Sequence, residues 1–115
     1  MSERGREILP WRRRAETISF KHQGAPGVNP SSYSATLGFY DDGRLGEIFM
    51  RAEKAGSELD VQARDISIGC SILLQHGCAL DVISRVLTRN SDGSASGPLG
   101  ALLDFLASGP NRGTA

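Results

Sequence analysis

Apolar and polar residues alternate along the N-terminal half of the chain, as they do in β-strands. The alternation covers residues 16–21, 33–40 and 44–51, and a period of two places every second side chain on the same face of a sheet. Asp41, Asp42 and Gly43 separate the second run from the third. An Asp-Gly pair between two such runs is typical of a two-residue hairpin turn, because glycine readily adopts the positive φ of a type I′ turn. The pattern predicts three strands, with a hairpin between the last two.

The expected turn at Asp42-Gly43 determines which residues of the hairpin face each other. The predicted pairs are Asp41 with Arg44, Phe39 with Gly46, Leu37 with Ile48, and Ala35 with Met50. This register keeps the apolar side chains on one face, whereas a slip of one residue would turn Glu47 into the core. The opposite face then carries Thr36, Tyr40, Leu45, Glu47 and Phe49.

The C-terminal half of the chain has the spacing of three and four residues that marks one face of a helix. Ser57 is a suitable N-cap, and a helix from there to His76-Gly77 has the apolar positions Leu59, Val61, Ala63, Ile66, Ile68, Cys70, Ile72 and Leu73. With so many apolar positions, we expect this helix to be the most buried. A second helix starts near Cys78 or Ala79 and buries Leu80, Ile83, Val86 and Leu87, and a third begins at Pro98 with the stripe Leu99, Leu102, Leu103 and Leu106.

Three strands followed by three helices predict an α+β fold: a three-stranded antiparallel sheet with the helices packed on one face. A chain of 115 residues has room for one core. Residues 1–14 are rich in arginine and show no period, so we expect a flexible basic arm. Residues 15–108 form the expected domain. Gly109-Pro110 ends the third helix, and residues 109–115 are expected to be a disordered tail.

Charge and composition limit the possible functions. Thirteen basic and thirteen acidic residues give a net charge of zero, whereas domains dedicated to nucleic acids usually have a basic excess. No apolar run is long enough to span a membrane, and the N-terminus lacks the apolar stretch of a signal peptide. We therefore expect a cytoplasmic protein, with no membrane partner and with both cysteines reduced.

The best candidate for a small-ligand site precedes the first helix. Lys54, Gly56 and Ser57 lie where free backbone N–H groups and a lysine can hold an anion such as a nucleotide phosphate. The alternative is ordinary capping of the helix. Capping is favoured because nearby acidic residues would repel an anion.

A second candidate site is the cluster Trp11, Arg12, Arg13 and Arg14. Its arginines are suited to phosphates and its tryptophan to stacking on a base, so the cluster is a possible nucleic-acid contact. The alternative is a solvated arm, which the zero net charge favours.

The remaining reactive residues do not form a recognisable catalytic or metal-binding set. Cys70 lies on the apolar helix stripe, where cysteine is usually a small hydrophobic residue, and its separation from Cys78 is not that of a thiol-exchange pair. The spacing of His22, Cys70, His76 and Cys78 does not match a zinc site. Glu47 is expected to form an ion pair with Lys54 or Arg44. We expect no catalytic residue, no metal and no cofactor.

Three segments resemble a known domain when they are taken in order. They are GRLGEIF at residues 43–49, KAGSEL at 54–59 and SILLQHG at 71–77, preceded by RRRAET at 12–17. Together they resemble the TSCPD domain, which forms a C-terminal part of adenosylcobalamin-dependent ribonucleoside-diphosphate reductases. The motif positions are Gly43, Arg44, Glu47, Lys54, Gly56, Ser57 and Gly77.

The resemblance implies an accessory domain rather than the reductase itself. The family enzymes carry a radical-bearing barrel and a tail with redox cysteines, and neither is found in these 115 residues. We therefore expect a stand-alone, non-catalytic interaction module linked to deoxyribonucleotide synthesis, although homology would lend it the reductase name. The alternative is a small nucleic-acid-binding protein. The expected partner is a second copy or a reductase subunit, and the expected interface is Tyr40, Leu45 and Phe49 on the uncovered face of the sheet.

Overall fold

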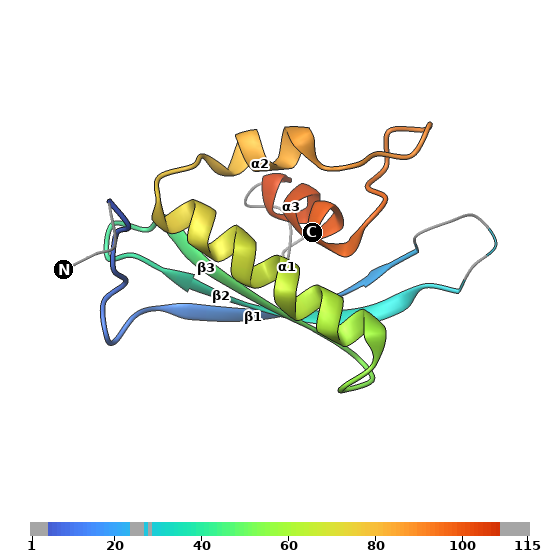
Figure 1. Ribbon diagram of the computed structural model, residues 1–115, viewed down its shortest axis with the longest axis horizontal. Helices are drawn as coiled ribbons and strands as arrows, with labels where there is room; N and C mark the ends of the chain where they lie inside the picture. Colours follow the sequence, from blue (N-terminus) through green and yellow to red (C-terminus); the bar gives the residue numbers. More distant parts are fainter. Residues whose placement is uncertain (1–4, 24–26, 28, 109–115) are drawn as a thin grey trace.

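A three-stranded antiparallel sheet with three helices on one side makes up the computed structural model, which confirms the expected α+β fold (Figure 1). The structure describes residues 5–23, 27 and 29–108, so the expected tail and the first four residues of the arm lie outside the described residues. The elements are β1 (Ala15–His22), β2 (Ser31–Phe39), β3 (Leu45–Ala52), α1 (Glu58–Gln75), α2 (Leu80–Val86) and α3 (Pro98–Ala107). The strands lie in the order β1-β2-β3, so β3 is an edge strand next to α1.

The centre of the β2–β3 hairpin has the predicted register, but its turn does not. Ala35 pairs with Met50, and Leu37 with Ile48, as expected. At the turn, the Gly43 N–H donates to the Tyr40 carbonyl over 2.9 Å, and the Tyr40 N–H donates to the Arg44 carbonyl over 2.9 Å. The loop therefore has three residues, 41–43, with Gly43 at a φ of 93°. The last residue of such a three-residue loop adopts the left-handed conformation. Gly43 therefore has the expected positive φ, but in a three-residue loop instead of a two-residue turn.

A bulge next to this turn changes which side chains face the core. Phe39 pairs with Leu45 instead of Gly46, so Leu45 turns toward the core and packs against it. Tyr40 is only 6% exposed. A Cβ at Gly46 would lie 2.6 Å from both Leu9 and Tyr40, so glycine is needed for their close approach. The prediction that Tyr40 and Leu45 lie on the exposed outer face was therefore wrong, whereas Phe49 does lie there, at 42% exposure.

Helix α1 covers β3 with a face that is half polar, whereas an apolar stripe was expected; of that stripe, Ala63 and Cys70 are buried as predicted. The buried residues of this helix are Asp60, Ala63, Ser67, Cys70, Leu74 and Gln75. Six large apolar residues are instead between 40% and 50% exposed: Leu59, Val61, Ile66, Ile68, Ile72 and Leu73. The helix thus has the predicted length and ends, but it is rotated relative to the apolar-inward orientation.

Hydrogen bonds to the edge of the sheet explain this rotation. The outer edge of β3 has backbone groups that β2 does not satisfy, and such edges need a cover. Four side chains of α1 bond to them: Asp60 accepts from the Ala52 N–H (2.9 Å), Ser67 from Met50 (3.2 Å) and Ser71 from Ile48 (2.8 Å), while the Gln75 amide donates to the Gly46 carbonyl (2.9 Å). We call Asp60, Ser67, Ser71 and Gln75 the polar stripe of α1. It takes the place of a fourth strand.

The two shorter helices complete the core from the same side of the sheet. Leu102 and Leu103 of α3 are 0% and 1% exposed, as the predicted stripe requires. In α2, Ile83 is buried, but Val86 is 77% exposed, so its predicted burial was wrong. Figure 1 shows α2 above α3, farther from the sheet than the other two helices.

Residues 5–14, expected to be a free arm, lie against the body of the domain. The Glu7 N–H donates to the Gln75 carbonyl (2.7 Å), and the Glu7 carbonyl accepts from the Tyr40 hydroxyl (2.8 Å). The Phe39 N–H donates to the Arg14 carbonyl (3.0 Å). The segment therefore covers the end of the sheet where β2 turns into β3. Most of these bonds use backbone atoms, so the pattern of apolar residues in the sequence could not predict them.

Candidate functional site

The start of α1, where an anion was a candidate ligand, is organised around the chain's own carboxylate. Ser57 is the N-cap, as predicted, and its hydroxyl accepts from the Asp60 N–H (3.2 Å). Gly56, at a φ of 78°, donates its N–H to an Asp60 carboxylate oxygen (2.9 Å). Asp60 therefore occupies the place that an external anion would take at Gly56. This geometry argues against an anion site at Lys54, Gly56 and Ser57. The Lys54 carbonyl accepts from the Ser57 hydroxyl (2.7 Å), whereas the Lys54 ammonium group has no partner within the described residues.

Arg51 joins Asp60 on the other side. Its guanidinium donates to both carboxylate oxygens, with distances of 3.0 and 3.1 Å. The Arg51 guanidinium, followed by the backbone N–H groups of Gly56 and Ala52, holds the pKa of Asp60 far below its ordinary value. The Asp60 side chain has no exposed surface. The charge at this position is thus satisfied internally and connects β3, the connecting turn and α1.

The side chains of the cluster Trp11, Arg12, Arg13 and Arg14 do not form one continuous exposed surface. Arg13 donates to Glu47 over 2.8 Å, and the guanidinium of Arg14 lies 4.1 Å from the centre of the Phe39 ring. Trp11, by contrast, is 93% exposed, and Arg12 is also exposed. Two of the four residues proposed for nucleic-acid contact therefore make contacts within the protein.

The ion pairs of Glu47 and Arg44 differ from those expected. Glu47 pairs with Arg13, not with Lys54 or Arg44, and its side chain lies across Gly38, where a Cβ would collide with it. Arg44 instead donates to both oxygens of Glu7, each over 2.8 Å, and to Asp42. Hydrogen bonding to Arg44 lowers the pKa of Glu7. The motif residues Gly43, Arg44 and Glu47 thus hold the arm and the hairpin together.

Gly77 ends α1 as predicted. It has a φ of 91°, and the Cys78 N–H donates back to the Leu73 carbonyl over 3.0 Å. Burial of Cys70, with a smaller effect of Cys78, raises the pKa of the Cys70 thiol to about 11. Cys70 is therefore protonated at neutral pH. Within the described part of the chain, no group of three or more His, Cys, Asp or Glu residues is placed to hold a metal ion.

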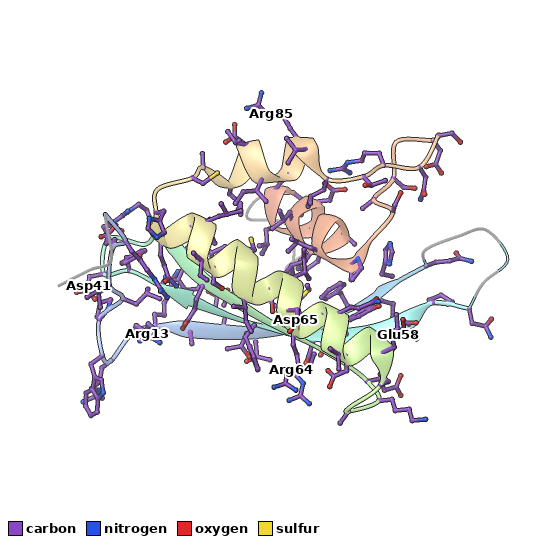
Figure 2. All side chains as sticks on the ribbon, in the orientation of Figure 1. Arg13, Asp41, Glu58, Arg64, Asp65 and Arg85 are labelled. Atoms are coloured by element: carbon purple, nitrogen blue, oxygen red, sulfur yellow. The ribbon has the colours of Figure 1, made fainter. Side chains whose placement is uncertain are left out.

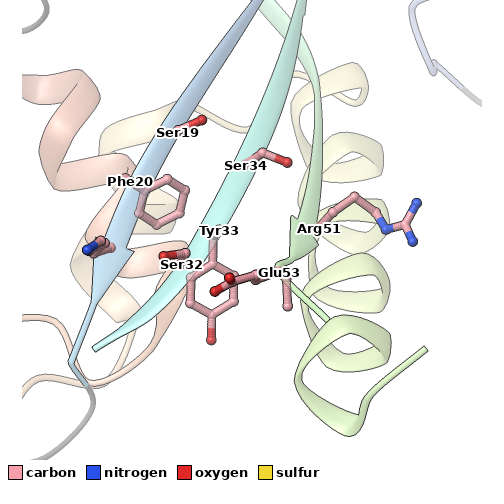
Figure 3. Close-up of a pocket in the computed structure, with 9 residues that line it drawn as sticks. Ser19, Phe20, Ser32, Tyr33, Ser34, Arg51 and Glu53 are labelled. Atoms are coloured by element: carbon pink, nitrogen blue, oxygen red, sulfur yellow. The ribbon is translucent and has the colours of Figure 1, made fainter. Parts of the chain in front are cut away.

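An open concavity of about 490 Å³ lies on the outer face of the sheet (Figure 3). Its polar lining comprises Ser19, Lys21, Ser32, Ser34, Arg51 and Glu53. Ser34 is opposite Ser19 on β1 and opposite Arg51 on β3. The lining contains no histidine or cysteine, so the chemistry it offers is hydrogen bonding and charge rather than nucleophilic attack.

A second depression, almost entirely apolar, separates α1 from α2. It has a volume of about 470 Å³, and its walls include Ile66, Gly69 and Leu73 of α1 and Val82 and Val86 of α2. We call it the α1–α2 groove. Val82 is 40% exposed and Leu73 is 48% exposed, so the groove is open to an apolar partner.

The polar stripe is the feature that the sequence interpretation missed. Its members lie at positions 60, 67, 71 and 75, which is a helical spacing of seven and four. Polar residues at that spacing form a second face of the helix, and that signal was available. To predict that the polar face, rather than the apolar face, packs on the sheet, one must know that no other element covers the edge of β3.

Comparison with known proteins gives one informative match. Over 78 residues the chain is 41% identical to part of a vitamin B12-dependent ribonucleotide reductase from Bradyrhizobium diazoefficiens. The match covers 68% of this chain but only 6% of that protein. No protein-family model matches the chain, and no solved structure matches it. The chain is therefore related to a small segment of a B12-dependent reductase. Among the described residues, no helix is both long and apolar enough to cross a membrane.

Proposed function

We propose that this chain is a TSCPD-type accessory domain that acts by contact with a B12-dependent ribonucleotide reductase. The observation that carries the proposal is the 41% identity to a segment of such an enzyme. The segments that resemble the TSCPD domain form the turn, the Asp60 junction and the C-cap of α1 in the structure. The resemblance therefore falls on residues that build the fold.

The state of the titratable groups supports a non-catalytic role. Asp60, Glu7 and Glu47 are each bound to an arginine, and Cys70 is a buried, protonated thiol. Groups engaged in this way stabilise the domain and are poorly placed for proton transfer. We also propose a cytoplasmic location. Two free cysteines support it, because the cytoplasm keeps thiols reduced.

The α1–α2 groove is the surface that we assign to the reductase contact. Its walls are mostly aliphatic, with Asp65 as the one charged residue of the lining, and Val86 of α2 is 77% exposed. An exposed apolar groove of this kind suits an apolar segment of a protein partner. Contact with the reductase would cover side chains that are otherwise in water, which is favourable by about 25 cal/mol per Å² of apolar surface.

Isothermal titration of the purified chain into a purified B12-dependent ribonucleotide reductase tests the proposal. We expect a micromolar complex, and the variant Val82→Glu should weaken it at least about tenfold by placing a charge in an apolar contact. Trp11→Glu is the matched control, because Trp11 is 93% exposed and does not line the groove. If no binding were detected with this chain at 100-fold molar excess over the reductase, the proposed function would be rejected. Binding that Val82→Glu leaves unchanged would reject the groove.

A further inference from the structure

A second exposed apolar surface lies on the opposite flank of α1, and it is separate from the α1–α2 groove. Val61, Ile68 and Ile72 project from the helix at 46%, 50% and 40% exposure. Phe49 of β3, at 42% exposure, lies beside Ile68 and Ile72 and shares with them a depression of about 430 Å³. We call these four residues the α1–β3 patch. The patch follows a helix of 18 residues, which is about 27 Å long.

Charged residues of both signs lie beside this patch. Arg6 and Glu47 line its depression and are bonded within the domain, to Gln75 and Arg13. Arg64 and Asp65 are both exposed, and neither has an ion-pair or hydrogen-bond partner for its side chain within the described residues. Figure 2 shows them leaving α1 in different directions. Adjacent helical positions are about 100° apart, so Arg64 lies on one side of the line through Val61 and Ile68, and Asp65 on the other. The two charges that remain without a partner within the described residues therefore give the patch a positive flank at Arg64 and a negative flank at Asp65.

A surface with one flank of each sign is complementary to itself in one orientation. A two-fold axis parallel to the helix brings each flank of one copy against the opposite flank of the other, so Arg64 meets Asp65 twice. A two-fold axis perpendicular to the helix would bring like flanks together, and arginine would face arginine. Flanking charges select orientation in paired helices by the same rule. The net charge of the chain is zero, so two copies do not repel each other as wholes.

We propose that the α1–β3 patch binds a second copy of this chain, with the two α1 helices parallel about a two-fold axis. Val61, Ile68 and Ile72 form the seam, and Phe49 covers its side toward the sheet. Arg64 of each copy pairs with Asp65 of the other. This interface differs from the expected one, which was centred on Tyr40, Leu45 and Phe49. It shares only Asp65 with the lining of the α1–α2 groove.

Sedimentation equilibrium with charge variants tests both the interface and its orientation. The wild-type chain should be a dimer at tens of micromolar. Arg64→Glu and Asp65→Arg should each raise the dissociation constant about tenfold, because each turns two attractive contacts into repulsive ones. The double variant R64E/D65R should restore the wild-type constant to within about threefold, because the flanks are then exchanged. Ile68→Glu should yield a monomer.

Several results would overturn the proposal. They are a wild-type chain that stays monomeric at 200 micromolar, a dimer that persists in Ile68→Glu, or a double variant no better than the single ones. Trp11→Glu is the control, because it adds the same charge at an apolar residue that is 93% exposed and lines neither of the two apolar surfaces. Its dimer should have the wild-type constant, and loss of that dimer would place the interface elsewhere. Circular dichroism checks that each variant is folded. Should Ile68→Glu unfold, the charge exchange alone decides, since exposed charged residues do not affect the core.

Discussion

Arg51 and Asp60 form a two-point ion pair, with distances of 3.0 and 3.1 Å, although Asp60 has no exposed surface at all. A buried carboxylate of this kind is stable only when every lone pair has a donor. Here the remaining donors are the backbone N–H groups of Ala52 and Gly56. The pair therefore connects the end of β3 to the start of α1.

Replacing Asp60 by Asn should destabilise the protein strongly and change its response to acid. The substitution leaves Arg51 without its counter-charge, and we expect the thermal midpoint at pH 7 to fall by about 10 °C or more. The folded pKa of Asp60 is lowered, so its contribution is complete above the unfolded pKa, near 4, and is lost as the pH falls below that value. Thermal unfolding at pH 7 and pH 3 should show a smaller midpoint difference between wild type and variant at pH 3. Asp81→Asn, an exposed position, is the control, and an equal effect there would contradict the role of Asp60.

Replacing Ser71 by Ala should lower the free energy of unfolding by about 1–3 kcal/mol, because the Ile48 N–H loses its acceptor. Urea denaturation measures the difference. Ser19→Ala removes the same hydroxyl from the exposed face of β1 and should have almost no effect. If the two variants were equally stable, Ser71 would not protect the edge of β3.

Deleting residues 1–14 should lower the thermal midpoint by roughly 5–10 °C. The deletion removes the acceptor of the Tyr40 hydroxyl and the Leu9 side chain that lies against Gly46. Differential scanning calorimetry gives the midpoint. Trp11→Ala should leave it unchanged, because that side chain is 93% exposed. A truncated protein as stable as the whole chain would mean that these contacts contribute nothing.

The two cysteines should differ in reactivity. At pH 8 a thiol reagent should modify Cys78, which is half-buried, much faster than Cys70, which is 3% exposed and has a pKa of about 11. Mass spectrometry of the native protein should find one label at early times, and two labels should appear in urea. Cys70→Ala should lower the unfolding free energy by about 1 kcal/mol through the cavity it leaves. Equal labelling rates in the native state would contradict this account.

The hairpin shows how far local pattern determines structure. Alternation placed Leu37 opposite Ile48 correctly, and Gly43 does have a positive φ. The turn type was not determined, because Asp-Asp-Gly suits both a two-residue and a three-residue loop. What selects the latter is the Asp42 carboxylate, which accepts from the Arg44 N–H, together with the bulge that Gly46 permits. These are contacts between neighbours in space, which periodicity does not report.

Helix α1 shows which features local sequence signals can predict and which depend on residues distant in the sequence. The capping signals at Ser57 and Gly77 placed the ends of α1 correctly, since capping is local. Its orientation depends on bonds to a strand edge that lies 8 to 29 residues away in the sequence. The rule that apolar faces turn inward therefore placed Ala63 and Cys70 correctly but not the larger aliphatic residues. The start of α1 agrees with the capping that was favoured over an anion site. Ser57 caps the helix, and the Asp60 carboxylate, counted only as a repelling neighbour, accepts from the Gly56 N–H.

The polar stripe reverses the usual pattern of mutational tolerance along a helix. In most amphipathic helices the aliphatic positions admit few substitutions and the polar positions admit many. In α1 the fold constrains Asp60, Ser67, Ser71 and Gln75, since each is bonded to the backbone of β3, alongside only three buried apolar positions, Ala63, Cys70 and Leu74. Changes at Ile66 or Ile68 leave those bonds intact, so selection for folding alone would let these aliphatic residues drift toward polar ones. Their retention in related chains would therefore report selection for binding rather than for stability.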